Sequence, residues 1–180
     1  MGRTREALFS MLEARGVDWA SSRVLDVFAG SGSLSFEAVS RGAGYALLLE
    51  NDPQVLRTIE ANIRLLGVES AVHVLADDAV RVLRKGTLVP FEVVFLDPPY
   101  RKNYAQQTLP LLSRAGWLTQ GSFVVAELEH DLTLAVPASF ELITERLFGQ
   151  TRVLLLRYMP SLEEKAMPDA RNNGQAETEA

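Results

Sequence analysis

The sequence contains no cysteine and only two histidines, His73 and His130. The missing thiols exclude disulfide bonds, thiolate metal sites and every mechanism that uses a cysteine nucleophile. Two histidines are too few for a histidine-rich metal site, so we expect no bound metal. No apolar run approaches the ~20 residues needed to cross a membrane, and the amino-terminal segment lacks the apolar core of a signal peptide. We therefore expect a cytoplasmic protein that does not span a membrane.

An excess of basic residues is also lacking. The 180 residues carry 23 acidic and 18 basic side chains, a formal charge of −5, which excludes a uniformly positive surface but allows local basic patches. Of this charge, −3 lies in residues 160–180, which hold five acidic and two basic residues and no aromatic or β-branched aliphatic residue. Such a segment buries too little apolar surface to offset the entropy of ordering it. We expect one folded domain at 1–159 and a disordered acidic tail at 160–180.

Residues 1–159 alternate short apolar runs with amphipathic stretches. The apolar runs predict strands at 23–28, 45–49, 71–75, 91–96 and 123–127. The amphipathic stretches predict helices around 3–14, 34–39, 53–66, 78–84 and 104–115. Two final runs, 140–147 and 152–156, predict a hairpin. Strands that alternate with helices form a parallel sheet covered on both faces, so the predicted fold class is α/β with a closing antiparallel hairpin.

The residues directly after each predicted strand are the first place to look for a site, because ligands of such sheets bind at the carboxyl ends of the strands. The first strand ends in a turn with two glycines, Gly30 and Gly32, which let the backbone approach a ligand closely. A plain strand-to-helix turn would use the same residues. The dinucleotide fingerprint needs a third glycine, and Ser35 stands at that position, which disfavours a dinucleotide.

Acidic residues follow the second and third predicted strands. Glu50 lies about twenty residues beyond the glycine turn, where a carboxylate can accept both hydroxyl hydrogens of a ribose. Taken alone, it could equally be a solvated acid. Asp77 and Asp78 could accept a hydrogen bond from an adenine amino group or cap the helix that begins near Ala79. Together with the glycine turn, Glu50 favours an adenosine-containing ligand.

The most specific motif, Asp97-Pro98-Pro99-Tyr100, follows the fourth strand. Its two prolines fix two φ angles and remove two backbone donors, which leaves carbonyls, especially that of Pro98, able to accept from a ligand. Asp97 adds a second acceptor, and Tyr100 adds an aromatic face. This combination suits a planar base that carries an –NH2 group. A rigid surface turn is the competing interpretation.

These motifs resemble those of class I S-adenosylmethionine-dependent methyltransferases, in the group that methylates amino nitrogens with an (Asp/Asn)-Pro-Pro-(Tyr/Phe) motif. Within that group the chain resembles the RsmD-type enzymes, which methylate the exocyclic N2 of a guanine in small-subunit (16S) ribosomal RNA. The matching stretches are 3–9, 25–32, 50–52, 97–100 and 148–151. The resemblance implies a Rossmann-like fold with a mostly parallel seven-stranded sheet, helices on both faces and a C-terminal antiparallel hairpin. It also implies a monomer that acts on ribosomal RNA in a small-subunit assembly particle.

The resemblance further assigns roles to residues of the motifs. S-adenosylmethionine, which becomes S-adenosylhomocysteine, would be bound by Asp26, Phe28, Ala29, Gly30, Ser31, Gly32, Glu50, Asn51, Asp52, Asp77, Asp78, Ala79 and Asp97. Asp78, rather than Asp77, would contact adenine. The target base would be held by Asp97, Pro98, Pro99 and Tyr100. Four basic residues could meet RNA phosphates or be solvated surface charges: Arg3, Arg5, Arg101 and Lys102.

The sequence departs from the family pattern at one point, and it does not identify the target base. Family members usually carry a basic β-hairpin before the N-terminal helix, whereas this sequence begins at the helix. Target choice is therefore expected to depend on Arg3, Arg5, the loop after Tyr100 and the shape of the substrate, or on a hairpin that is missing here. Adenine N6, cytosine N4 and guanine N2 all offer an –NH2 group. Three alternative functions are weighed. The protein could methylate amino groups of DNA or of a protein glutamine, it could be a cofactor-binding subunit without activity, or it could be a nicotinamide dehydrogenase. Methylation of pyrimidine C5 is disfavoured because it needs a cysteine adduct.

Overall fold

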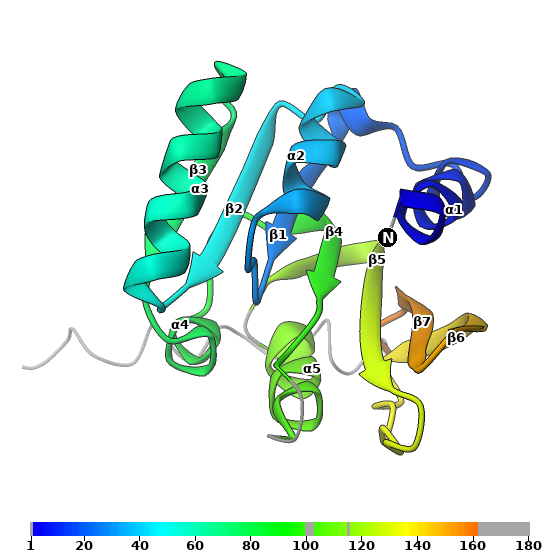
Figure 1. Ribbon diagram of the computed structural model, residues 1–180. Coiled ribbons are helices and arrows are strands. Elements are labelled where there is room, and N and C mark those ends of the chain that lie inside the picture. The colour runs from blue at the N-terminus through cyan, green and yellow to red at the C-terminus, as the bar shows by residue number, and fades with distance from the viewer. Residues whose placement is uncertain (1, 100–102, 115, 162–180) are drawn as a thin grey trace, which may run out of the picture.

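The computed structural model shows a single seven-stranded sheet with helices packed on both faces (Figure 1). It describes residues 2–99, 103–114 and 116–161, with 2–4 described by their backbone alone, so most of the predicted acidic tail lies outside the described residues. The helices are α1 (Gly2–Glu13), η1 (Trp19–Ser21, a 3-10 turn), α2 (Ser33–Ser40), α3 (Pro53–Leu66), α4 (Ala79–Lys85) and α5 (Tyr104–Arg114). The strands are β1 (Arg23–Asp26), β2 (Tyr45–Glu50), β3 (Val72–Ala76), β4 (Phe91–Leu96), β5 (Leu118–Glu129), β6 (Phe140–Phe148) and β7 (Thr151–Tyr158).

The strands are arranged in the order β3-β2-β1-β4-β5-β7-β6. Strands β1 to β5 run parallel, and β7 pairs antiparallel with both β5 and β6. From β1 the chain continues to β2 and β3 on one side of the sheet, and from β4 it continues to β5 on the other side. The connections that follow the neighbouring strands β1 and β4 therefore lead in opposite directions. A crevice forms at this switch point, at the carboxyl ends of the strands.

The core lies in two layers, one on each face of the sheet. Residues of β1 and β4 alternate between the layers: Val24 and Val93 face one, and Leu25 and Val94 face the other, all fully buried. Helices α1, α2 and α3 cover the first layer, and α4 and α5 cover the second. Because both faces are covered, the central strands read as continuous apolar runs, as the sequence predicted.

Local signals in the sequence fix the ends of α3. Asp52 caps its first turn, where its Oδ1 accepts from the N–H of Gln54 at 2.7 Å, and Pro53 occupies the first helical position. Gly67 ends the helix at a φ of 64°, a left-handed conformation that suits glycine. The predicted helix 53–66 is confirmed.

Several strands differ in length from the prediction, and β1 and β5 are two of them. β1 ends at Asp26, so that Val27 and Phe28 lie in the following turn instead of ending the strand. β5 begins at Leu118, five residues earlier than predicted, although polar residues and a glycine interrupt its apolar pattern. Ser122 explains this continuity, because its buried hydroxyl donates to the carbonyl of Phe91 at 2.8 Å and so ties the irregular part of β5 to β4.

In the part of the chain that is described, no helix is long and apolar enough to cross a membrane.

Candidate active site

A cavity of about 920 Å³ opens at the switch point between β1 and β4. Its volume is typical of a site for a small-molecule ligand. The segments that follow β1, β2, β3 and β4 line it, together with β5 and the start of β7. Of the described residues predicted for the site, Gly32 and Pro98 are outside this lining. The predicted residues that line it are Arg5, Asp26, Phe28, Ala29, Gly30, Ser31, Glu50, Asn51, Asp52, Asp77, Asp78, Ala79, Asp97 and Pro99.

Backbone donors hold the carboxylate of Glu50 at the end of β2. One oxygen accepts from the N–H of Gly30 at 3.1 Å, and the other accepts from the N–H groups of Asn51 at 2.8 Å and Asp52 at 2.9 Å. A carboxylate offers about four acceptor positions, so one position on Glu50 is left for a ligand. These bonds also join the turn after β1 to the end of β2.

The turn after β1 requires its two glycines for different structural reasons. Gly30 has a φ of 52°, and nothing lies within 4 Å of where its Cβ would be, so its backbone borders open space. Gly32 has a φ of 78°, and a Cβ there would stand 2.8 Å from the ring of Phe36. Gly30 therefore leaves room for a ligand, whereas Gly32 allows the turn to pack against α2.

Asp26 is anchored beneath the cavity by Ser35. The two side chains are almost fully buried, and the Ser35 hydroxyl donates to Asp26 Oδ2 at 2.9 Å. Burial raises the pKa of Asp26 to about 7, the bond from Ser35 opposes this, and nearby carboxylates add to the rise. The serine that replaces the third glycine of the dinucleotide fingerprint thus joins α2 to β1.

Replacing Ser35 with alanine is expected to lower the free energy of unfolding at pH 7 by about 1–3 kcal/mol, because a buried carboxyl group loses its hydroxyl donor. Urea denaturation followed by circular dichroism measures this change. Ser40→Ala, on the exposed end of the same helix, is the matched control and should change stability by less than about 0.5 kcal/mol. Equal effects of the two substitutions would show that the Ser35 bond does not support the fold.

Asp77 and Asp78 both line the cavity but have different partners. Asp77 forms an ion pair with Arg81, which lowers the pKa of Asp77, and it also lies 3.7 Å from Lys85. Asp78 caps α4 through Oδ1, which accepts from the N–H of Arg81 at 2.8 Å. The capping role weighed for Asp78 is confirmed, and its second oxygen accepts no hydrogen bond from the described residues.

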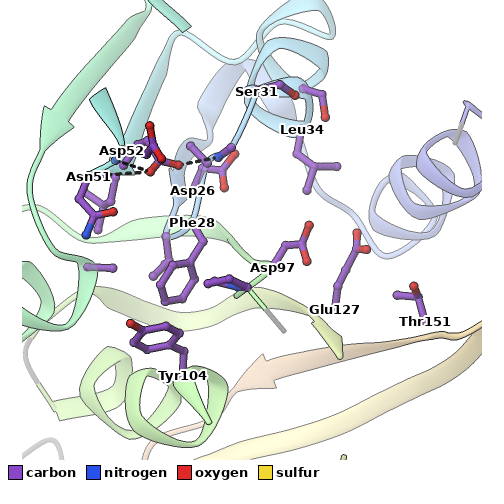
Figure 2. A pocket seen from close by; sticks show the side chains of 18 of the residues that line it. Asp26, Phe28, Ser31, Leu34, Asn51, Asp52, Asp97, Tyr104, Glu127 and Thr151 are labelled. Atoms are coloured by element: carbon purple, nitrogen blue, oxygen red, sulfur yellow. Dashed lines mark hydrogen bonds between the residues drawn. The ribbon is translucent and has the colours of Figure 1, made fainter. Parts of the chain in front are cut away.

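Asp97 faces the cavity from the end of β4 (Figure 2). It is open to solvent through the cavity, yet the surrounding protein is dense enough that burial raises the pKa of its carboxyl group. Pro99 lines the cavity next to it. The remaining predicted residues of this region, Tyr100, Arg101 and Lys102, lie outside the described residues, as does the side chain of Arg3.

The sequence interpretation missed several residues of the cavity. The most informative are Tyr104, at the start of α5, and Glu127, near the end of β5. The Tyr104 ring lies 5.3 Å from that of Phe28, so the two form one aromatic wall (Figure 2). Glu127 closed a predicted strand, and the rule of examining strand ends would have found it. Thr151, from the final matching stretch, also lines the cavity.

Arg5 is the described basic residue that lines the cavity, from the side of α1. Its Nε lies 3.7 Å from a carboxylate oxygen of Glu37, and its side chain is 39% exposed. Such an exposed pair contributes little to stability and leaves the guanidinium accessible. Within the described residues, no cluster of acidic or histidine side chains could hold a metal ion.

Comparison with known proteins identifies the family. A family model described as conserved hypothetical protein 95 matches residues 1–157. The ribosomal RNA small subunit methyltransferase D of Escherichia coli is 38% identical over 149 residues, which cover 82% of this chain and 73% of that protein. A methylase structure from Haemophilus influenzae, 34% identical, superimposes with a TM-score of 0.79 and covers 88% of this chain and 98% of its own.

A more distant structure supports the fold alone. The RNA methyltransferase from Salinibacter ruber in complex with S-adenosyl-L-homocysteine is 18% identical, with a TM-score of 0.66 over 87% of this chain and 93% of its own. Its likeness agrees with the Rossmann-like sheet and antiparallel C-terminal strands described above. From the matched family model and the identity to its relatives, the chain belongs to the RsmD family of methyltransferases.

Proposed function

We propose that this protein transfers a methyl group from S-adenosylmethionine to the exocyclic N2 amine of a guanine in small-subunit (16S) ribosomal RNA. The observation that carries the proposal is a single cavity that joins Glu50 and the turn after β1 to Asp97 of the Asp-Pro-Pro motif. The first group is suited to an adenosine-containing cofactor and the second to a base with an amino group. The named relative from Escherichia coli acts on small-subunit ribosomal RNA and supports this substrate.

The cavity residues fit the cofactor. Glu50 has one acceptor position left for a ribose hydroxyl, and the free oxygen of Asp78 can accept from the adenine amino group. The open space beside Gly30 allows the methionine end to lie against the backbone, next to Phe28. When bound, the cofactor supplies a sulfonium methyl group, whose transfer leaves a neutral thioether and needs neither a metal nor a covalent enzyme intermediate.

Asp97 and Pro98 would prepare the amine of the target base. An exocyclic nitrogen is a poor nucleophile because its lone pair is conjugated with the ring. When its two hydrogens are accepted by the Asp97 carboxylate and the Pro98 carbonyl, the nitrogen becomes more pyramidal and its lone pair turns toward the methyl group. Preorganised acceptors also stabilise the positive charge that develops on nitrogen, and positioning supplies much of the remaining rate.

One proton must leave the nitrogen after methyl transfer. Asp97 already accepts a hydrogen bond from this nitrogen in the proposed complex, so it is placed to receive the proton. Burial raises the pKa of Asp97, which makes its carboxylate a better proton acceptor than an exposed aspartate. Release to solvent through the open cavity would restore the enzyme.

The basic residues complete the proposed RNA site. Arg5 stands at the cavity, where its guanidinium can meet a phosphate of the strand that delivers the base. The contributions of Arg3, Arg101 and Lys102, stacking of the base on Tyr100, the monomeric state, the cytoplasmic location and the assembly particle as substrate stay predictions from the sequence.

Small ribosomal subunits that lack the modification provide the test. Incubation with the purified protein and isotopically labelled S-adenosylmethionine, followed by nucleoside mass spectrometry of the digested RNA, should yield labelled N2-methylguanosine. Parallel reactions with DNA and with a glutamine-containing protein extract should yield no labelled base or residue. Label in N6-methyladenosine, N4-methylcytidine or methylglutamine instead would overturn the proposed target.

A further inference from the structure

Glu127 lines the cavity but has no role so far. It is not among the residues proposed to bind the cofactor, and it does not belong to the Asp-Pro-Pro motif. Leu96 and Ala126 are partners in the parallel register of β4 and β5, so the residues that follow them, Asp97 and Glu127, come side by side. Both line the same cavity, and Figure 2 shows their side chains extending into it from adjacent strands. Two carboxylates therefore stand together where the target base would enter.

Glu127 differs from Asp26 and Glu50, two other acidic residues that line the cavity. Asp26 accepts a hydrogen bond from Ser35, and three backbone N–H groups hold Glu50. Glu127, although partly buried, accepts no hydrogen bond and forms no ion pair within the described ranges 2–99, 103–114 and 116–161. Burial, and then the charge of Asp97, raise the pKa of Glu127 to about 7. Such an acceptor is costly unless a ligand brings a donor to it.

The three amino bases present different edges to a pair of acceptors. Guanine carries two donors side by side, its N2 amine and its N1–H. Adenine and cytosine place an unprotonated ring nitrogen, N1 or N3, beside their amine, and this atom is itself an acceptor. Two neighbouring carboxylates therefore complement the edge of guanine and repel the lone pair of the other two bases.

We propose that Glu127 accepts a hydrogen bond from N1–H of the target guanine while Asp97 accepts one from N2, so that Glu127 selects guanine over adenine and cytosine. This inference rests on the proposed function and names the residue that determines its target base. A donor at this position favours the charged form of Glu127 and so lowers its pKa again. The N1–H and N2–H donors of guanine then offset the repulsion between the two carboxylates.

The test compares guanine with 2-aminopurine at the target nucleotide of a small-subunit RNA assembled by chemical synthesis and ligation. 2-Aminopurine keeps the reactive amine but has an acceptor at N1 and no N1–H. The wild-type protein should prefer guanine in kcat/KM by about 10–100-fold, the size expected for a hydrogen bond to a charged group. Glu127→Gln should bring this ratio close to one, because the glutamine amide can either accept from N1–H or donate to an unprotonated N1.

Glu129→Gln is the matched control, because Glu129 lies two residues further along β5 and does not line the cavity. It should leave the guanine preference unchanged. Glu127→Asp, which keeps the charge on a shorter side chain, should retain part of the preference. The ratio is insensitive to a general loss of folded enzyme, since both substrates meet the same preparation.

The possible failures can be told apart. A wild-type protein that methylates 2-aminopurine as fast as guanine overturns the role of Glu127 without any variant being needed. An unchanged ratio in Glu127→Gln does the same and leaves the proposed function intact. Absence of N2-methylguanosine in the wild-type reaction overturns the proposed function itself, and the role of Glu127 with it.

Discussion

Replacing Asp97 with alanine is expected to lower kcat for methyl transfer by about 10²–10³-fold, the cost of removing one preorganised hydrogen-bond partner of a transition state. The amine would lose the acceptor that turns its lone pair toward the methyl group and the group that receives its proton. Single-turnover methylation of small subunits, with the protein in excess, measures this step apart from RNA release. Calorimetry with S-adenosylmethionine should show a change in Kd of less than about tenfold, since Glu50 and the turn after β1 are intact.

Asp97→Asn separates the two roles of this residue. The amide carbonyl still accepts one hydrogen bond but cannot take a proton, so the loss in kcat should be smaller than for alanine if positioning dominates. Neither variant should unfold the protein, because the charge of Asp97 is a source of repulsion in the fold: it raises the pKa values of Asp26 and Glu127. Thermal unfolding should occur at an equal or higher temperature than in the wild type. Undiminished methyl transfer by Asp97→Ala would overturn the mechanism.

Much of the fold follows from local patterns in the sequence. The parallel strands are apolar on both faces, and the caps of α3 stand in the sequence as Asp52, Pro53 and Gly67. The position of β7 could not be predicted in this way. It lies between β5 and β6, and this placement depends on pairing between β5 and β7, which are separated along the chain by β6. A hairpin pattern reports only that its two strands pair with each other.

The site was predictable to the extent that its residues follow strands directly. Asp97 follows β4, Glu50 follows the predicted strand 45–49 and is the last residue of β2, and both line the cavity. Tyr104 reaches the cavity from the start of α5, and nothing in its local sequence marks it as different from a packing residue. Asp26 was expected to bind the cofactor, and the cavity does include it, but its hydrogen bond to buried Ser35 also gives it a structural role. Sequence alone could not separate these roles because both place an acid at the end of β1.

Replacing Glu50 with alanine is expected to raise the Kd for S-adenosylmethionine by about 100-fold or more. The substitution removes the charged acceptor of a ribose hydroxyl, and a hydrogen bond to a charged group contributes about 1.5–3 kcal/mol. It also removes the bond that holds Gly30 in the turn after β1. Calorimetric titration of the purified protein measures the change. Glu60→Ala, an exposed position on α3, is the control and should leave the Kd unchanged.

A cofactor analogue shows which of these two losses matters. The 2′,3′-dideoxy form of S-adenosylhomocysteine lacks both ribose hydroxyls, so the wild-type protein should bind it about 10–100-fold more weakly than the parent compound. If Glu50 contacts the ribose, Glu50→Ala should bind the two compounds almost equally, because the partner of the hydroxyls is already gone. If Glu50→Ala still discriminates between them as the wild type does, Glu50 acts through the backbone of Gly30 alone. The ribose contact proposed for Glu50 would then be wrong, although the turn that it stabilises would still explain a weaker Kd.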